Sequence, residues 1–316
     1  MSITASAGGA AVSMNDAQAH SRPRRRLNVL PYALVIPILL YEGLLILYPI
    51  AQGIYGSFTQ IELASNKPVT WVGADNYVRM LNDPDFWMVM QTTLIFTALV
   101  IVASITAGLV TAMLFNRSFP LRPLARAMLM LPWAFPEISV VMIFIWILNP
   151  QFGVVNLAIS WLPGYSDNPQ WLQIPWTAMA WMVLITAWKA FPFYSLVLLA
   201  ALQAVPQDLY EAAKVDGANP VQLFANITVP SIRTTLELLI VLASIFSFKQ
   251  FTIIYLMTGG GPSGTTETIV MRIFNTAFRF YDYSYATAIG VAGFLVSLVI
   301  ACFFIVLQAR RAQENA

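Results

Sequence analysis

Long apolar stretches make up most of the chain, and shorter polar segments separate them. About 20 apolar residues are enough for a helix to cross a bilayer, and six segments reach that length. They are 31–53, 86–116, 127–148, 175–203, 235–257 and 283–309. The pattern therefore predicts an all-α polytopic membrane protein with six transmembrane helices.

The composition also indicates a membrane location. Of the 316 residues, 58% are hydrophobic and 10% are charged, and the mean hydropathy is +0.69. Soluble domains carry roughly 25% charged residues, so this chain has too little polar surface for water. One cysteine, Cys302, and one histidine, His20, exclude an internal disulfide and argue against a zinc site or a Ser-His or Cys-His catalytic group. We expect no cofactor, no metal, no enzymatic activity and no nucleic-acid partner.

Lysine and arginine are distributed unequally between the two sides of the six spans. With both termini inside, eleven of these residues fall on the inner side and four on the outer side. The inner residues are Arg22, Arg24, Arg25, Arg26, Arg117, Arg122, Arg126, Lys214, Arg233, Arg310 and Arg311, and the outer ones are Lys67, Arg79, Arg272 and Arg279. Because positive charge favours the cytoplasmic side, both termini are predicted to be cytoplasmic. The predicted organisation is a cytoplasmic tail at 1–26, disordered or on the inner surface, a six-span domain at 27–309 and a cytoplasmic tail at 310–316.

The polar segment between the fourth and fifth spans predicts two short helices joined by a turn. Pro206 suits a first helical position, and Gly217 can end the first helix in the left-handed conformation. Asn219 and Pro220 supply an N-cap and a first residue for the second helix, which should end near Pro230. The charge distribution places this hairpin in the cytoplasm.

The stretch EAAKVDGA within this hairpin resembles the EAA motif of permease subunits in binding-protein-dependent ABC importers. The resemblance implies that the hairpin, at about 206–230, docks into a groove on an ATPase. Asp216 would fix the turn, and Phe224 and Ile227 would be apolar anchors on one helix face. The ATPase-coupling residues that it implies are Glu211, Ala212, Ala213, Asp216, Gly217, Ala218, Phe224, Ile227 and Pro230.

Other stretches resemble the sugar-permease branch of the same family, which includes maltose and glycerol-phosphate importers. RAMLMLPWAFP at 126–136, WKAFPF at 188–193 and FKQFTIIYLMTGGGP at 248–262 occur in the family's order. The branch often has a proline where this chain has Thr234 and an aspartate where it has Thr252. Because of Thr234, the residue at which the hairpin ends is not fixed by the resemblance. Because of Thr252, the resemblance says less about which residues of the fifth span contact the substrate.

The resemblance implies a permease subunit of an ATP-driven bacterial ABC importer in the inner membrane. The chain would form half of a pathway for a sugar or sugar-like solute. Its partners would be a second homologous permease, two ABC ATPase subunits, an extracytoplasmic solute-binding protein and membrane lipid. The ATPase subunits would hydrolyse ATP, because the glycine-rich stretch GGGPSGTT of this chain lacks the lysine of a phosphate loop.

Charged residues inside the spans leave two interpretations open. Each costs about 2.5–3.5 kcal/mol near mid-membrane, so each should face a partner or a wet cavity. The charged residues are Glu42, Glu137, Lys189, Glu237 and Lys249. One interpretation is a substrate pathway, whose residues would be Lys189, Ser247, Lys249 and Gln250. The other is structural pairing of either lysine with Glu137 or with a neighbouring subunit.

Two other functions compete with the importer. An ion-coupled secondary transporter would use Glu42, Glu137 and Lys189 as a proton relay, and a membrane-embedded enzyme would use carboxylates. Neither accounts for the polar hairpin. Tryptophans around the third and fourth spans would stack on sugar rings or anchor the membrane interface; they are Trp133, Trp146, Trp161, Trp171, Trp176, Trp181 and Trp188.

Overall fold

The computed structural model describes residues 29–61, 68–161 and 169–314. The predicted tail at 1–26 and the outer Lys67 lie outside the described residues. Within them the regular secondary structure is helical apart from one short antiparallel pair of strands, β1 (Thr59–Gln60) and β2 (Thr70–Trp71). The predicted all-α fold is confirmed.

The contacts divide the chain into two units at Pro49 and Ile50. The boundary lies within one helix, in which α1 (Val29–Glu42) continues through the π-helical turn η1 (Gly43–Leu47) into α2 (Tyr48–Ser57). The described apolar side chains of this helix, such as Leu34 and Leu44, are exposed. Its 24 residues from Leu34 to Ser57 are apolar and long enough to cross a membrane.

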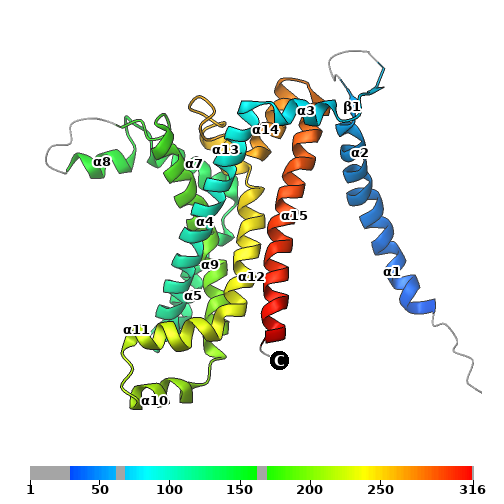
Figure 1. The fold of residues 1–316 in the computed structure, drawn as a ribbon. Coiled ribbons are helices and arrows are strands. Elements are labelled where there is room, and N and C mark those ends of the chain that lie inside the picture. Colours follow the sequence, from blue (N-terminus) through cyan, green and yellow to red (C-terminus); the bar gives the residue numbers. More distant parts are fainter. Residues whose placement is uncertain (1–28, 62–67, 162–168, 315–316) are drawn as a thin grey trace, which may run out of the picture. The chain divides into compact units, whose positions relative to one another are not determined.

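Four long helices form the framework of the second unit (Figure 1). The helices α4 (Pro84–Asn116) and α9 (Pro175–Gln203) pack against each other along their length. The helix α12 (Val229–Phe248) contacts both of them and α15 (Tyr283–Glu314). An added Cβ at Gly108 would lie 2.9 Å from Tyr194 Cβ, so α4 and α9 approach closely because this residue is glycine.

The predicted hairpin forms between α9 and α12 and consists of α10 (Gln207–Val215) and α11 (Pro220–Leu223). Gly217 adopts a φ of 82°, the left-handed geometry expected of a residue that ends a helix. The Asn219 and Gln222 side chains accept hydrogen bonds from each other's backbone N–H at 3.0 and 2.8 Å. This reciprocal capping box fixes the start of α11. Pro206 is the N-cap of α10, one position before the predicted place.

The second helix of the hairpin does not end near Pro230, contrary to the prediction. It passes through the π-helical turn η2 (Phe224–Thr228) directly into α12. The Val229 N–H donates to the Phe224 carbonyl, so the helix is widened just before Pro230. A proline ring would crowd the carbonyl four residues earlier in a regular α-helix, and the wider turn accommodates it. The hairpin is therefore continuous with the fifth span.

The predicted third span is broken rather than straight. It consists of α5 (Arg122–Leu129), α6 (Leu131–Ala134) and α7 (Glu137–Ile147), with a 90° bend before α7. Phe135 and Pro136 at the bend have extended ψ angles of 141° and 134°. Proline disfavours the helical conformation of the residue before it, which explains the position of the break. The described residues hold five helices able to cross a membrane, or six if this bent pair is one span.

The predicted fifth span is broken as well. Its helix α12 ends at Phe248, and the chain resumes as α13 (Thr252–Met257). Lys249 is thus the C-cap of α12 and lies outside a regular helix, not within one as the sequence suggested. The residues 249–251 form a short unwound segment.

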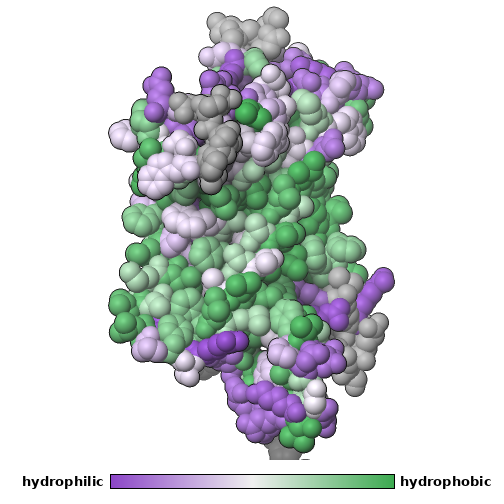
Figure 2. All heavy atoms as spheres, turned by 90° about the vertical axis from the view of Figure 1, so that its left-hand side faces the viewer, coloured by the Kyte–Doolittle hydropathy of each residue, from purple (hydrophilic) through white to green (hydrophobic). Residues whose placement is uncertain are grey.

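Short elements cover the end of the second unit opposite the hairpin (Figure 1): α3 (Asp75–Leu81), α8 (Val154–Ser160), α14 (Ile269–Phe274) and the π-helical turn η3 (Asn275–Arg279). Arg272 joins them to α4, since its guanidinium lies 3.3 Å from Asp85 and 3.4 Å from Glu267. Figure 2 shows hydrophobic side chains in a band across the middle of the visible face and hydrophilic ones at both ends. The chain is a multi-pass membrane protein.

Candidate functional site

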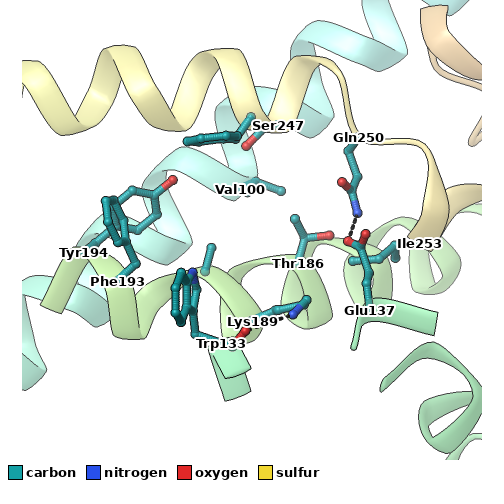
Figure 3. Close-up of a pocket in the computed structure, with 12 residues that line it drawn as sticks. Val100, Trp133, Glu137, Thr186, Lys189, Phe193, Tyr194, Ser247, Gln250 and Ile253 are labelled. Atoms are coloured by element: carbon teal, nitrogen blue, oxygen red, sulfur yellow. Dashed lines mark hydrogen bonds between the residues drawn. The ribbon is translucent and has the colours of Figure 1, made fainter. Parts of the chain in front are cut away.

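The two helix breaks lie beside one cavity of about 270 Å³ (Figure 3). Its lining comes from α4, α6, α7, α9, α12 and α13 and from the unwound segment 249–251. The aromatic lining residues are Trp133, Phe193, Tyr194 and Phe246, and the polar ones are Glu137, Thr186, Lys189, Ser247 and Gln250.

Lys189 satisfies backbone groups that the first break leaves without helical partners. Its ammonium donates to the Phe135 carbonyl at 2.7 Å and the Trp133 carbonyl at 3.3 Å. Carbonyls at the end of a helix have no intrahelical donor, and the Lys189 ammonium supplies one to each of these two. Lys189 therefore stabilises the bend from the middle of α9.

Glu137 and Gln250 connect the two breaks. The Gln250 amide donates to the Glu137 carboxylate at 2.7 Å, as drawn in Figure 3. Glu137 is the first residue of α7, where the helix dipole favours negative charge. Neither Lys189 nor Lys249 forms an ion pair with Glu137 in the described part of the chain. The structural pairing of a lysine with Glu137, one of the two interpretations of the sequence, is therefore not found.

Three of the four predicted pathway residues line the cavity. Ser247 is buried, and Lys189 and Gln250 are half-buried beside it. Lys249 is exposed and lies apart from the lining; its ammonium is 4.8 Å from the centre of the Phe246 ring, a cation–π distance. Phe246 itself lines the cavity, so Lys249 contacts the site through that ring.

The aromatic side of the cavity was only partly predicted. Trp133 is 52% exposed, and its ring stacks on Phe193 at 6.5 Å between centroids and 20° between planes. Sequence reasoning named Trp133 among seven tryptophans but missed Phe193 and Tyr194. Phe193 lies four residues after Lys189, on the same helix face, and this spacing could have identified it.

The cavity can bind a small polar molecule by two kinds of contact. Ring faces offer apolar contact, while Gln250, Glu137 and Ser247 supply hydrogen-bond donors and acceptors. Among the described residues, no group of three or more His, Cys, Asp or Glu side chains could hold a metal ion.

The hairpin presents its predicted coupling residues unequally. Glu211 and Asp216 are exposed, whereas Phe224 is half-buried and Ile227 packs against the core around α4, α9 and α12. The most exposed large apolar side chains are instead Val215 at 87% and Val221 at 73%. Sequence reasoning missed them, although Val215 is an apolar residue on the polar helix α10.

The sequence is similar to known transport proteins over most of its length. The profile of the family "Binding-protein-dependent transport system inner membrane component" matches residues 104–313. The chain is 36% identical over 289 residues to the inner membrane ABC transporter permease protein YcjO of Escherichia coli (strain K12), which covers 90% of this chain and 96% of that protein. It is 34% identical over 277 residues to the sulfoquinovosyl glycerol transport system permease protein SmoG of Agrobacterium fabrum, covering 88% and 89%. With the trehalose/maltose transport system permease protein MalF of Thermococcus litoralis it shares 32% identity over 296 residues, covering 93% and 98%.

The fold is similar to that of two solved structures. One is the crystal structure of a bacterial ABC transporter involved in the import of the acidic polysaccharide alginate. The TM-score is 0.76 at 26% identity, covering 89% of this chain and 95% of that chain. The other is a bacterial alginate ABC transporter in complex with an alginate pentasaccharide-bound periplasmic protein, with a TM-score of 0.74 at 26% identity, covering 87% and 92%.

Proposed function

Since the chain belongs to the family of binding-protein-dependent transport system inner membrane components, we propose that the cavity between its two helix breaks passes a sugar or sugar-like solute. The chain is a permease subunit of an ABC importer and not an enzyme. Neither the family nor these relatives support the ion-coupled carrier.

The lining of the cavity is the observation that carries the solute class. Sugars present apolar C–H faces and many hydroxyls, and aromatic rings together with hydrogen-bonding side chains match both. Trp133 on Phe193 supplies a ring face, and the Glu137–Gln250 pair supplies an acceptor and a donor. Two relatives are named for the transport of sulfoquinovosyl glycerol and of trehalose and maltose, which supports this class.

The assembly would contain this chain, a second homologous permease, two ATPase subunits and an external solute-binding protein. The alginate transporter bound to a periplasmic protein supports the last of these. The test is reconstitution in proteoliposomes. We expect uptake of a labelled disaccharide only with ATP, both permeases and the loaded binding protein; uptake by this chain alone, driven by a proton gradient, would contradict the proposal.

The hairpin end of the second unit would face the cytoplasm, with both termini on the same side. Of Arg79, Arg272 and Arg279 at the opposite end, the first two are ion-paired with acidic residues, so most of the uncompensated positive charge among the described residues lies toward the hairpin. In a Cys302→Ser background, a membrane-impermeant thiol reagent applied to sealed cells should label Ser263→Cys and not Lys214→Cys. The reverse pattern would refute both the topology and the docking role of the hairpin.

The continuity between the hairpin and the fifth span supports the proposed coupling role. From Pro220 to Phe248 the backbone is helical without interruption, and Gln250 of the cavity follows two residues later. A displacement of α11 by an ATPase would therefore reach the second helix break through a stiff element. Glu211, Asp216 and Gly217, which precede α11 in the hairpin, would shape the surface that docks on the ATPase.

Gly217 provides the sharpest test of docking. Its φ of 82° strains any β-branched residue, while no atom would lie within 4 Å of an added Cβ. Gly217→Val should therefore reach the membrane but lose co-purification with the ATPase subunits. Gly217→Asn is the matched control, because asparagine tolerates the left-handed conformation. Normal assembly and uptake by the valine variant would show that the hairpin does not couple.

A further inference from the structure

The first hairpin helix, α10, has few attachments to the rest of its unit (Figure 1). None of its residues is buried. Tyr210 packs against the core around α4, α9 and α12. Among the described residues, no other α10 side chain forms a hydrogen bond or an ion pair with another element. Apart from the backbone at its two ends, α10 is therefore held mainly by Tyr210.

The Tyr210 hydroxyl reaches the π-helical turn η2 at the start of the fifth span. Its oxygen lies 3.1 Å from Thr228 Oγ1, and Thr228 Oγ1 donates to the Leu223 carbonyl at 3.3 Å. A threonine hydroxyl carries a single proton, so Tyr210 is the donor to Thr228. The two bonds therefore form a chain from α10 through η2 to the last residue of α11.

This chain of two hydrogen bonds gives α10 a second connection to the fifth span. The first connection is the backbone, which passes through Gly217 and the exposed turn around it. Glycine restricts backbone rotation less than any other residue, so the turn alone transmits the orientation of α10 poorly. The Tyr210–Thr228 bond bypasses that turn, and Thr228 is buried, so the contact is shielded from water. The bond thus fixes the angle between the two helices of the hairpin.

We propose that Tyr210 is a positioning residue that transmits movement of α10 to the fifth span. The proposal rests on the proposed docking of the hairpin on an ATPase, since Tyr210 directly precedes Glu211 on the same helix. A load on α10 then reaches Thr228 directly. From Val229 the backbone of α12 is helical to Phe248, so the displacement continues to the unwound segment 249–251 beside the cavity.

Hydrogen exchange of the purified transporter complex tests whether the bond holds α10. Tyr210→Phe removes the hydroxyl and keeps the ring in its packing. Because one hydrogen bond contributes a modest net stability, we expect the amides of 207–215 to exchange about two- to tenfold faster in this variant. The co-purifying ATPase subunits should be unchanged in amount, because the exposed docking residues are not altered. Equal exchange in variant and wild type, or loss of the ATPase subunits, would overturn the proposal.

The response to nucleotide separates transmission from stability. Exchange of residues 245–255 is compared with and without a non-hydrolysable ATP analogue, so no transported solute is required. We expect a nucleotide-dependent change in wild type and a change at least about twofold smaller in Tyr210→Phe. An undiminished response in the variant would overturn this proposal alone. No response in wild type would contradict the coupling role of the hairpin itself, and this proposal with it.

Variants at Thr228 show whether the two residues act through one bond. Thr228→Val should match Tyr210→Phe, and Thr228→Ser should behave as wild type because the hydroxyl remains. The double variant Tyr210→Phe/Thr228→Val should be no worse than Thr228→Val, and additive effects would refute a shared bond. Tyr55→Phe is the matched control, since it removes the hydroxyl of an exposed tyrosine; an equal effect there would overturn the proposal. If Thr228→Val does not assemble, Tyr210→Phe and Thr228→Ser still decide the outcome.

Discussion

The Glu137 carboxylate accepts a hydrogen bond of 2.7 Å from the Gln250 amide, and this bond joins the bend before α7 to the unwound segment after α12. Gln250 follows the helix that begins in the hairpin, whereas Glu137 begins a helix on the far side of the cavity. We therefore expect a displacement of one break to move the other and to change the shape of the cavity between them.

Exchanging these two residues tests the connection. Gln250→Glu alone places two carboxylates at hydrogen-bond distance and should destabilise the complex by about 1–3 kcal/mol, seen as a lower midpoint of thermal unfolding. The swap Glu137→Gln/Gln250→Glu restores a donor and an acceptor and should recover at least half of that loss. Additive effects of the two single changes would mean that the bond contributes nothing.

Lys189 is expected to act by holding the bend rather than by touching solute. Lys189→Met leaves the carbonyls of Trp133 and Phe135 without their donor, at a cost of about 0.5–1.5 kcal/mol; thermal unfolding of the purified complex measures this loss. Lys189→Arg keeps donors at this position and should retain most of the stability. An unchanged stability together with a large rise in KM for uptake would identify Lys189 as a solute contact instead.

Gly108 sets the distance between α4 and α9. Gly108→Ala would bring a methyl group to 2.9 Å from Tyr194 Cβ, close to the backbone of α9, so the helices must separate, at about 1–3 kcal/mol. Gly53→Ala in α2 is the control, because no atom beyond its own helix lies within 4 Å of the added methyl. We expect a lower unfolding temperature for the first variant only; equal shifts would show that helix propensity, not packing, is responsible.

Val215 and Val221 should contribute directly to binding of the ATPase. Both are exposed in this chain, so Val215→Asp/Val221→Asp should leave its own stability unchanged. An unpaired carboxylate in an apolar interface is costly, and we expect at least about tenfold weaker association with the ATPase subunits in a pull-down titration. Val78→Asp, at an exposed valine on the opposite end of the unit, should have no effect on that association.

Local chemistry explains which parts of the fold the sequence predicts well. The fourth span was predicted at 175–203, the bounds of α9, because a proline begins it and the apolar run is unbroken. The hairpin turn was predicted because Gly217 and the Asn219–Pro220 pair act on their immediate neighbours. The end at Pro230 was wrong, because the π-helical turn before it accommodates the proline ring, a local arrangement that rules for regular α-helices do not include.

The cavity was harder to predict because both breaks lie within apolar sequence. Hydropathy reflects burial and not backbone conformation, so the apolar stretches continue through Phe135 and Phe251 although the helices do not. Pro136 did signal the first break, whereas nothing in the sequence around Lys249 marks the second. Three of the four residues predicted for a pathway line the cavity, because polar residues in a membrane must face one another or a wet space; the aromatic lining residues Phe193 and Tyr194 carry no such requirement.

The π-helical turn at Phe224–Thr228 acts as one additional residue within an otherwise α-helical rod. Each residue rotates the direction of side chains by about 100° around a helix axis. The turn therefore sets the direction of the α11 side chains around the helix axis independently of the side of α12 that contacts α4 and α9. Deleting one residue there would leave α12 packed against α4 and α9 and rotate the hairpin by roughly a quarter of a revolution, so under the proposed coupling role this short turn would set the orientation of the hairpin toward the ATPase.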